Sequence, residues 1–202
     1  MKSLTIPYVE GFEGPAAFSK TVLSELPWAA EYPYKPEVTL YAAHSSDAVL
    51  LRFEVKEDNV KAVCVSDNGP VWEDSCVEFF VKTPDSPYYF NFETNCIGTG
   101  LAAKRTSRKD CTHFTAAMME RILRKSSLPA VPVNDGKGEW TLELTVPFSV
   151  LDCGNRPGRL LANFYKCGDK TAQPHFLSWA PIDTPSPDFH RPEFFGELLL
   201  EW

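Results

Sequence analysis

The chain has 202 residues, a net charge of -7 and 44% hydrophobic residues, with 17 prolines and six cysteines. This length suits a single all-β domain, and no apolar run approaches the ~20 residues of a membrane-spanning helix. The negative charge argues against nucleic acid and anionic membranes as partners, but it leaves neutral sugars open.

Two patterns bear on the cellular compartment, the amino terminus and the cysteines. Residues 1–10 contain no apolar core segment and no small-residue cleavage site, so they do not form a signal peptide. The sequence as it stands predicts a cytoplasmic protein, with a secreted or periplasmic location as the alternative if a leader has been removed. No Cys-x-x-Cys pair occurs, which favours reduced, mostly buried thiols and no metal site.

The segment 1–35 has the least regular pattern, because four prolines interrupt it. Apolar residues at helical spacing favour a short helix over 16–26. Trp28 follows a proline and is expected to pack against the rest of the chain. We expect this segment to wrap the domain of residues 36–202 and not to fold separately.

From residue 37 onward, apolar and polar residues alternate with the period of β-strands. The turn 44–47 joins two such runs, which predicts a hairpin, and residues 147–151 suit a helical turn. The pattern as a whole predicts a two-sheet antiparallel β-sandwich of immunoglobulin-like or jelly-roll type. Strands are expected within 38–43, 49–56, 76–81, 88–95, 140–146, 159–166, 175–182 and 193–201.

The stretch 71–81 joins a loop to a strongly apolar strand. Alternation places Glu78 on the opposite face from Val77 and Phe79. An acid in such a strand lies at a wet rim or is held by hydrogen bonds, because burying an unpaired carboxylate is costly. Trp72 lies in the loop before the strand, where it either contacts a ligand or caps the core.

The next strand, 88–95, carries Tyr89, Asn91, Glu93 and Asn95 on one face. Paired in a hairpin with the strand of Glu78, these side chains would form a polar patch beside Trp72. The alternative is an ordinary solvated outer face of an antiparallel sheet.

The order of these motifs resembles the family 9 carbohydrate-binding modules, which belong with the DOMON-like sandwiches. In 72–80 the shared pattern is Trp, acids, then Val-Glu-hydrophobic-Phe. In 189–198 it is an aromatic residue, Pro, then Phe-Gly-x-Leu. Residues 47–53 and 97–100 also match, so the resemblance covers roughly 36–202.

The resemblance implies non-catalytic binding of a mono- or oligosaccharide, accessory to carbohydrate breakdown. Two loop aromatics would sandwich the sugar, and acid, amide and guanidinium groups would bind its hydroxyls. Such a set fits a pyranose, because its ring packs on aromatic faces and its hydroxyls need hydrogen-bond partners. The implied ligand-binding residues are Trp72, Glu78, Asn91, Glu93, Phe189 and Arg191.

Other functions remain open at this stage. A glycoside hydrolase could use Glu78 and Glu93 as its carboxylate pair. A divergent sandwich without a sugar ligand could act as an accessory or protein-interaction domain. The wider group includes haem proteins with Met and His ligands, for which the candidates are Met118, Met119, His113 and His175.

No cofactor is expected, with calcium as the one candidate that the resemblance allows. The loop carboxylates Asp67, Asp74 and Asp85 would supply its oxygen ligands, although they lack the spacing of an EF-hand. The basic run 104–109 is expected to be a solvated excursion from the sheet.

Overall fold

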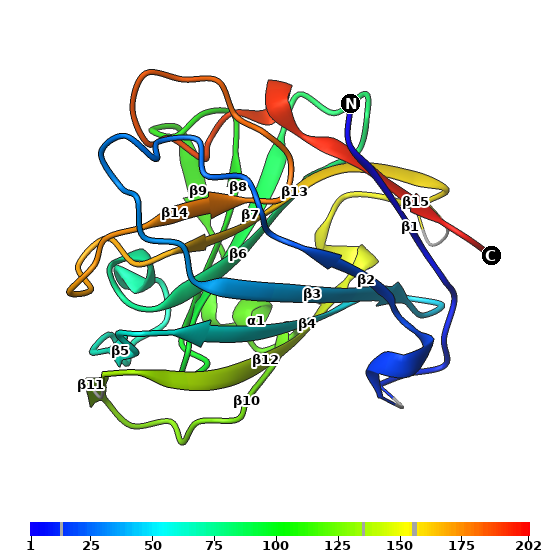
Figure 1. The fold of residues 1–202 in the computed structure, drawn as a ribbon. Coiled ribbons are helices and arrows are strands. Elements are labelled where there is room, and N and C mark those ends of the chain that lie inside the picture. Colours follow the sequence, from blue (N-terminus) through cyan, green and yellow to red (C-terminus); the bar gives the residue numbers. More distant parts are fainter. Residues whose placement is uncertain (13, 135, 155–156) are drawn as a thin grey trace.

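The computed structural model describes residues 1–12, 14–134, 136–154 and 157–202, which form a β-sandwich (Figure 1). The predicted two-sheet fold is confirmed. Among the described strands, pairing is antiparallel except between the first and last, which run parallel. Within the described residues, no helix has the length and hydrophobicity needed to cross a membrane.

The larger sheet has eight strands and carries the residues of greatest interest. Its main path places the strand of Glu78 near the middle, between the strands of Tyr165 and Glu93. In spatial order the strands are β1 (Ser3–Ile6), β15 (Gly196–Leu200), β13 (Arg159–Cys167), β6 (Cys76–Lys82), β7 (Tyr89–Asn95), β8 (Gly100–Arg105) and β9 (Cys111–His113), with β14 (Phe176–Ser178) also paired to β13.

The second sheet has five strands, and a separate two-stranded pair flanks it (Figure 1). The five are β10 (Leu123–Ser126), β12 (Gly138–Pro147), β4 (Ala48–Glu57), β3 (Glu37–His44) and β2 (Ser19–Val22), and the pair is β11 (Val133–Asn134) with β5 (Lys61–Ala62). The helical turns are η1 (Pro15–Ala17), η2 (Val71–Glu73), α1 (Ala116–Met119), η3 (Phe148–Val150) and η4 (Pro192–Phe194).

The amino-terminal segment contributes a strand to each sheet. The helix predicted over 16–26 is wrong, since η1 is followed by β2, which pairs with β3 from Ser19 opposite Ala42 to Val22 opposite Thr39. Pairing with the open edge of β3 satisfies backbone groups that a helix would leave exposed along that edge. Trp28 is buried against the ring of Phe189, as the sequence predicted.

The main core lies between the two sheets and contains the apolar faces that alternation predicted. Val77 and Phe79 point into it, and Phe79 stacks on Phe164 with ring centroids 5.2 Å apart. Trp140 is also buried there, and its indole N–H donates to a carboxylate oxygen of Glu57 at 2.7 Å.

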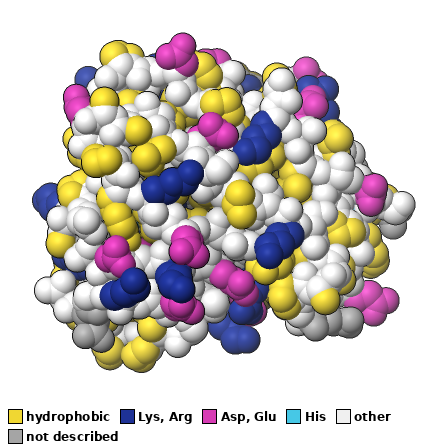
Figure 2. Space-filling view, viewed as in Figure 1, with side chains coloured by type: hydrophobic (Ala, Val, Ile, Leu, Met, Phe, Trp, Pro, Cys, Tyr) yellow, Lys and Arg dark blue, Asp and Glu magenta, His cyan; other side chains and the backbone are white. Residues whose placement is uncertain are grey.

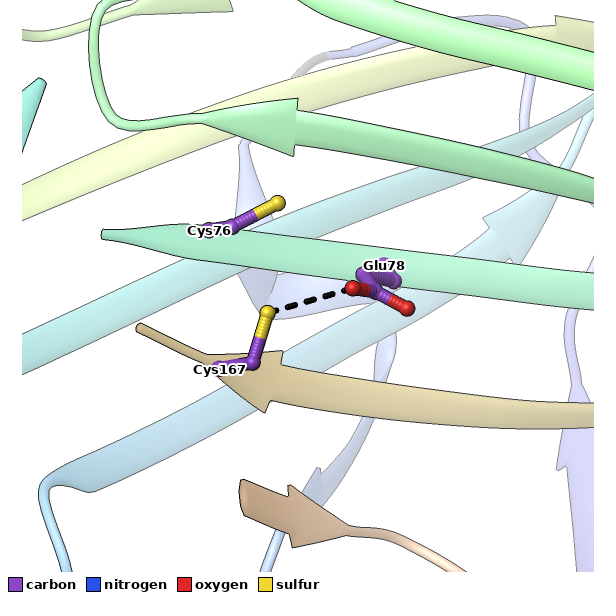
Figure 3. A group of neighbouring side chains, drawn as sticks. All are labelled: Cys76, Glu78 and Cys167. Carbon is purple, nitrogen blue, oxygen red and sulfur yellow. Dashed lines mark hydrogen bonds between the residues drawn. The ribbon is translucent and has the colours of Figure 1, made fainter. Parts of the chain in front are cut away.

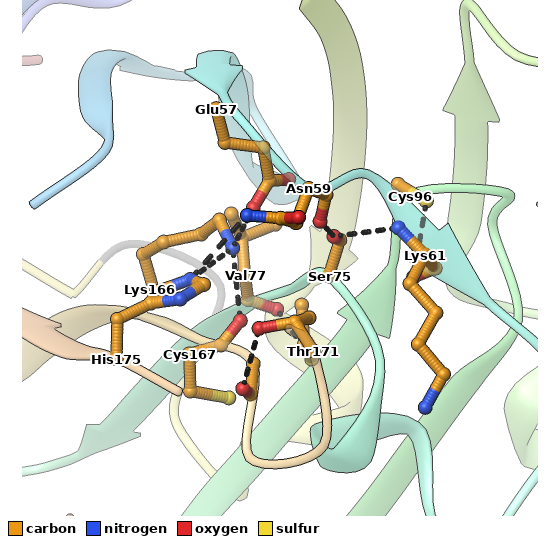
Figure 4. Close-up of polar contacts among 12 residues, drawn as sticks. Glu57, Asn59, Lys61, Ser75, Val77, Cys96, Lys166, Cys167, Thr171 and His175 are labelled. Carbon is orange, nitrogen blue, oxygen red and sulfur yellow. Dashed lines mark hydrogen bonds and ion pairs between the residues drawn. The ribbon is translucent and has the colours of Figure 1, made fainter. Parts of the chain in front are cut away.

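That carboxylate belongs to a buried polar cluster at one end of the core (Figure 4). Lys166 and Glu57 form an ion pair at 2.9 Å with both side chains 0% exposed. The Lys166 ammonium also donates to Nε2 of His175 at 2.7 Å. Burial lowers the pKa of His175 well below its ordinary value, and the lysine charge lowers it further, so the imidazole accepts this bond as a neutral group.

The outer face of the five-stranded sheet is polar, in contrast to its inner face. Figure 2 shows Lys and Arg side chains beside Asp and Glu side chains on this side of the molecule. Arg52 forms ion pairs with Glu54 and Glu143 there, at 3.0 and 2.8 Å. Because charges of both signs alternate there, this face is an ordinary solvated surface. Its exposed ion pairs contribute little to stability.

The outer face of the eight-stranded sheet is covered, which corrects the interpretation of a solvated strand face. Asn91 is 0% exposed and Glu93 is 4% exposed. A second apolar cluster packs over this face, drawn from the sheet, from Trp28 and from the carboxyl-terminal loop around Phe189. The loops leave a hollow above β6, β7, β8 and β13, and the candidate site lies in that hollow.

Candidate functional site

A pocket of about 400 Å³ opens above the outer face of the eight-stranded sheet. Strand residues Glu78, Glu93, Arg105 and Cys167 form its floor. The remaining lining residues come from the covering loops and from β14: Tyr32, Trp72, Arg108, Asp169, Phe176, Pro187, Asp188, Phe189 and His190.

Trp72 lies on the turn η2 at the pocket wall, and 37% of its surface is exposed. The turn is held by a neighbouring loop, because Asp169 N donates to Trp72 O at 3.1 Å and Lys170 N donates to Glu73 O at 3.0 Å. An ion pair of 2.8 Å between Lys170 and Glu73 reinforces this contact. The indole is therefore presented to the pocket from a fixed backbone.

Glu78 and Glu93 lie directly opposite each other on β6 and β7. Burial raises the pKa of Glu78 well above its usual range, and the facing Glu93 raises it further. Burial also raises the pKa of Glu93 to about 7, although the guanidinium of Arg105 opposes this shift. The floor of the pocket thus contains carboxyl groups that can hold a proton near neutral pH.

Asn91 positions Glu93 from the adjacent place on the same face of β7. Its amide N–H donates to Glu93 Oε1 at 2.8 Å, and its oxygen accepts from Arg105 Nε at 2.6 Å. Arg105 is held at its other end by a bond of 2.8 Å from Nη1 to the carbonyl oxygen of Arg108. Because Asn91 is wholly buried, its amide is committed to these two neighbours.

Phe189 lines the pocket but is only 8% exposed. One face of its ring stacks on Tyr165, with centroids 4.1 Å apart and planes 6° from parallel. The Tyr165 hydroxyl also donates to Phe189 O at 3.2 Å. Phe189 thus lies in the same pocket as Trp72, as expected, but one of its two faces is already covered.

His190 completes the wall beside Phe189. The Tyr89 hydroxyl lies 3.0 Å from its Nδ1. Burial lowers the pKa of His190 to about 3, and the charges of Arg105 and Arg108 add to this effect. The imidazole is therefore neutral at physiological pH and can accept the tyrosine hydrogen bond.

Comparison with known proteins identifies the family of this chain. The sequence model of "Carbohydrate-binding family 9" matches residues 15–200. This chain belongs to carbohydrate-binding family 9. No curated protein matches the sequence.

The solved structures that are similar to this chain include the three that follow. A Bacteroides uniformis protein described as a candidate carbohydrate-binding protein is 37% identical, with 99% of both chains covered and a TM-score of 0.92. A family 9 module from Caldicellulosiruptor kristjanssonii in complex with cellotriose is 11% identical, with 99% of this chain and 94% of that chain covered and a TM-score of 0.65. The module from the same organism in complex with glucose is 13% identical, covers 99% and 96%, and has a TM-score of 0.61.

Two of the residues predicted from the family 9 resemblance, Asn91 and Arg191, do not line the pocket. Arg191 instead pairs with Glu193, with Nη2 and Oε1 2.6 Å apart, and its guanidinium lies over the ring of Phe194. The described pocket takes its arginines from Arg105 and Arg108. The prediction of a solvated basic run is therefore wrong for Arg105, which is 7% exposed.

Sequence reasoning missed Arg105 because it treated 104–109 as one loop. The alternation of side chains in β8 would have revealed it. Ala103 and Arg105 are the register partners of Asn91 and Tyr89, so their side chains lie on the same sheet face. Extending the strand to residue 105 would have placed the guanidinium over the polar patch.

Two aromatic residues of the pocket were also missed, Tyr32 and Phe176. Both are half-buried, and their rings meet edge-on with centroids 4.8 Å apart. Tyr32 comes from the irregular amino-terminal segment, where no strand pattern marks its direction. The family 9 pocket of this chain therefore includes a residue from the segment that wraps the sandwich.

Two of the three calcium candidates, Asp67 and Asp74, are engaged by other groups, and Asp85 is exposed. Asp67 forms two hydrogen bonds with the Arg124 guanidinium, at 2.6 and 2.8 Å. Asp74 accepts bonds from the backbone of Val63 and Cys64 and from the amide of Asn95. The haem candidates are not brought together, since His113 lies on the edge strand β9 and His175 in the buried cluster beside β13.

Proposed function

We propose that this family 9 domain binds a mono- or oligosaccharide in the pocket above the eight-stranded sheet. The observation that carries the proposal is the meeting of an exposed indole, Trp72, with the buried acid pair Glu78 and Glu93 in one cavity. A sugar needs both an apolar ring contact and hydrogen-bond partners for desolvated hydroxyls. This pocket supplies the two together.

In this proposal the sugar packs on Trp72, with Phe189 forming the adjacent wall. Glu78 and Glu93 meet its hydroxyls from the floor, and Arg105 donates from beside them. Asn91 acts as a positioning residue, because its two hydrogen bonds orient Glu93 and Arg105. Arg105 thus takes the role that we predicted for Arg191.

The pocket size supports a small ligand or the end of a chain. Its volume of about 400 Å³ lies at the lower end of the ~300–1,000 Å³ typical of small-molecule sites. The sheet closes one side, so a long glycan could not pass through the floor. The ligands named for the two similar modules, glucose and cellotriose, are therefore the first to test.

Binding without catalysis fits the family and the geometry of the two acids. Carbohydrate-binding family 9 is a family of non-catalytic modules. A glycoside hydrolase needs carboxyl groups on both sides of the scissile bond. Glu78 and Glu93 leave the same sheet face from neighbouring strands, which suits gripping hydroxyls from one side.

The experiment is a fluorescence and calorimetric titration of the parent protein with glucose and cellotriose. We expect saturable binding that Trp72→Ala weakens at least tenfold. Tyr88→Ala is the matched control, because Tyr88 is 40% exposed and lies in the turn before β7, away from η2. Equal affinities for the parent and Trp72→Ala, or an equal loss in both variants, would show that the sugar does not bind in this pocket.

A further inference from the structure

Figure 3 shows a cluster of three potential metal ligands, two of which, Glu78 and Cys167, belong to the pocket floor. One ligand atom each from Cys76, Glu78 and Cys167 lies within 4.8 Å of the other two, and all three residues are buried. Cys76 and Cys167 are register partners on β6 and β13, and Glu78 follows Cys76 on the same strand face. The sheet itself therefore fixes the three side chains side by side.

The thiols of this cluster make weak hydrogen bonds to the oxygens around them. The Cys167 thiol donates to Glu78 Oε1 at 3.1 Å, while the Cys76 thiol lies 3.6 Å from the carbonyl oxygen of Val77. Among the described residues, no donor other than the Cys167 thiol forms a hydrogen bond with the Glu78 carboxyl group. No lysine or arginine among them forms an ion pair with Glu78.

A second observation comes from the facing strand. Glu93 Oε2 is buried and has no hydrogen-bond partner among the described residues. Glu93 is 4% exposed, lies directly opposite Glu78 and lines the same cavity. An unpartnered buried oxygen that faces a cavity can accept a hydrogen bond from a water molecule or a ligand there.

We propose that Cys76, Cys167 and Glu78 form a binding site for a thiophilic divalent cation of the zinc class. Two thiolates and one carboxylate are ligands that Zn²⁺ accepts in tetrahedral sites. Cys167 and Glu78 line the pocket, so the fourth position faces the cavity and is open to water. The cavity is also the route by which the cation enters.

Loading the site follows a simple proton balance. Each thiol loses its proton to solvent as its sulfur bonds to the cation, and no oxidant or reductant takes part. Two protons are released per cation if Glu78 is ionised, and three if it is protonated. Sequence spacing could not reveal this site, because its two cysteines lie on strands that are far apart in the chain.

A thiol–imidazole pair elsewhere in the described chain must be distinguished from this site. The Cys111 thiol lies 3.9 Å from Nε2 of His113 on the edge strand β9. That pair offers two ligands on an exposed strand, and the buried cluster offers three. A Cys111→Ser variant removes it and leaves Cys76, Glu78 and Cys167 unchanged, although Cys111 pairs with Arg105 across β8 and β9.

The experiment titrates the reduced full-length protein with Cd²⁺ and follows the ultraviolet charge-transfer band of cadmium thiolates. We expect one cation per chain, displaced by Zn²⁺, with the band lost in Cys76→Ser and in Cys167→Ser. Cys111→Ser and Cys153→Ser should keep it, and Glu78→Gln should weaken binding at least tenfold. Thermal unfolding and circular dichroism establish which variants are folded.

X-ray absorption of the zinc-loaded parent tests the same site without any substitution. We expect two sulfur neighbours at about 2.3 Å with the remaining ligands oxygen. A shell of one sulfur with imidazole would overturn the proposal in favour of Cys111 and His113. Absence of a stoichiometric band in the parent, or a band that survives in both folded Cys76 and Cys167 variants, would also overturn it.

Discussion

Two buried acid clusters lie on opposite faces of the same sheet, and they differ in how their charge is satisfied. Between the sheets, Glu57 meets the Lys166 ammonium at 2.9 Å and the Trp140 indole N–H at 2.7 Å. On the outer face, Glu78 and Glu93 oppose each other, and one oxygen of Glu93 has no hydrogen-bond partner among the described residues. Glu57 Oε2 also lacks a hydrogen bond in the described part of the chain, but the Lys166 ammonium compensates its charge within the fold. The outer pair has no such ion-pair partner among the described residues and faces a cavity.

This contrast separates an acid whose charge is compensated within the fold from acids that remain open to a ligand. A buried carboxylate that has its own cation stabilises the fold only while the partner is present. Carboxyl groups placed against each other raise one another's pKa and cost stability, so a role in binding explains their presence better. Substitutions in the two clusters should therefore have opposite consequences.

The largest effect is expected in the inner cluster. Lys166→Met leaves Glu57 buried without its ion-pair partner, which should lower the free energy of unfolding by about 3–5 kcal/mol. Denaturant unfolding of the parent and the variant measures this loss. A loss below about 1 kcal/mol would mean that water or His175 replaces the lysine. It would contradict the claim that Glu57 depends on Lys166 for its charge compensation.

The outer acids should show the reverse pattern. Glu93→Gln removes the mutual repulsion with Glu78, so we expect unchanged or slightly higher stability. Sugar affinity should fall about tenfold or more, because a hydroxyl loses its carboxylate partner at a cost of about 1–3 kcal/mol. Calorimetry with glucose and cellotriose, beside the unfolding curve, measures both. A variant that binds as the parent does would deny Glu93 a role in the site.

Substitutions of Arg105 and Arg191 test which arginine donates hydrogen bonds to the sugar. Arg105→Met should weaken sugar binding about tenfold, the effect of losing about 1.5 kcal/mol from a charged hydrogen bond. Arg191→Met should change affinity by less than a factor of two, since Arg191 pairs with Glu193. Titrations of both folded variants make the comparison. The opposite ranking would return the donor role to Arg191.

The smallest effect concerns His190, the neutral histidine beside the pocket. Its pKa is lowered to about 3 in the folded chain, so below pH ~6.5 the unfolded chain binds a proton that the folded chain does not. Stability should therefore fall as the pH drops from 6.5 toward 3, by at most about 1.4 kcal/mol per pH unit.

Comparison with His190→Asn isolates this contribution from that of the acids. The difference in unfolding free energy between parent and variant should be independent of pH above 7 and should change progressively below 6.5. Denaturant unfolding at a series of pH values measures it. A difference that stays constant down to pH 4 would show that His190 is protonated in the folded state.

Alternation of side chains was enough to predict most of the sandwich. The strands around Val77, Phe79 and Trp140 have strong period-two patterns, and burial on one face follows directly from that period. The amino-terminal strand β2 was not predictable in this way, because its structure depends on pairing with β3. Such non-local pairing overrides a local helical pattern.

Residues of the candidate site were predictable where they lie on one strand or hairpin. They were not predictable where several elements contribute to the pocket. Trp72 and Glu78 are close in sequence, and Glu93 follows from a hairpin register. Arg105 and Tyr32 depend on where a strand ends and how a loop folds back. The stacking of Tyr165 on Phe189, which covers one aromatic face, is a tertiary contact that no spacing reveals.

The most direct test of sugar binding at this pocket is a nuclear magnetic resonance titration of the five tryptophan indoles with glucose and then cellotriose. The account predicts a saturable shift of the Trp72 indole signal, identified by its loss in Trp72→Phe, while the buried Trp140 signal stays in place. A saturable shift confined to another indole, or no shift at millimolar sugar, would contradict it.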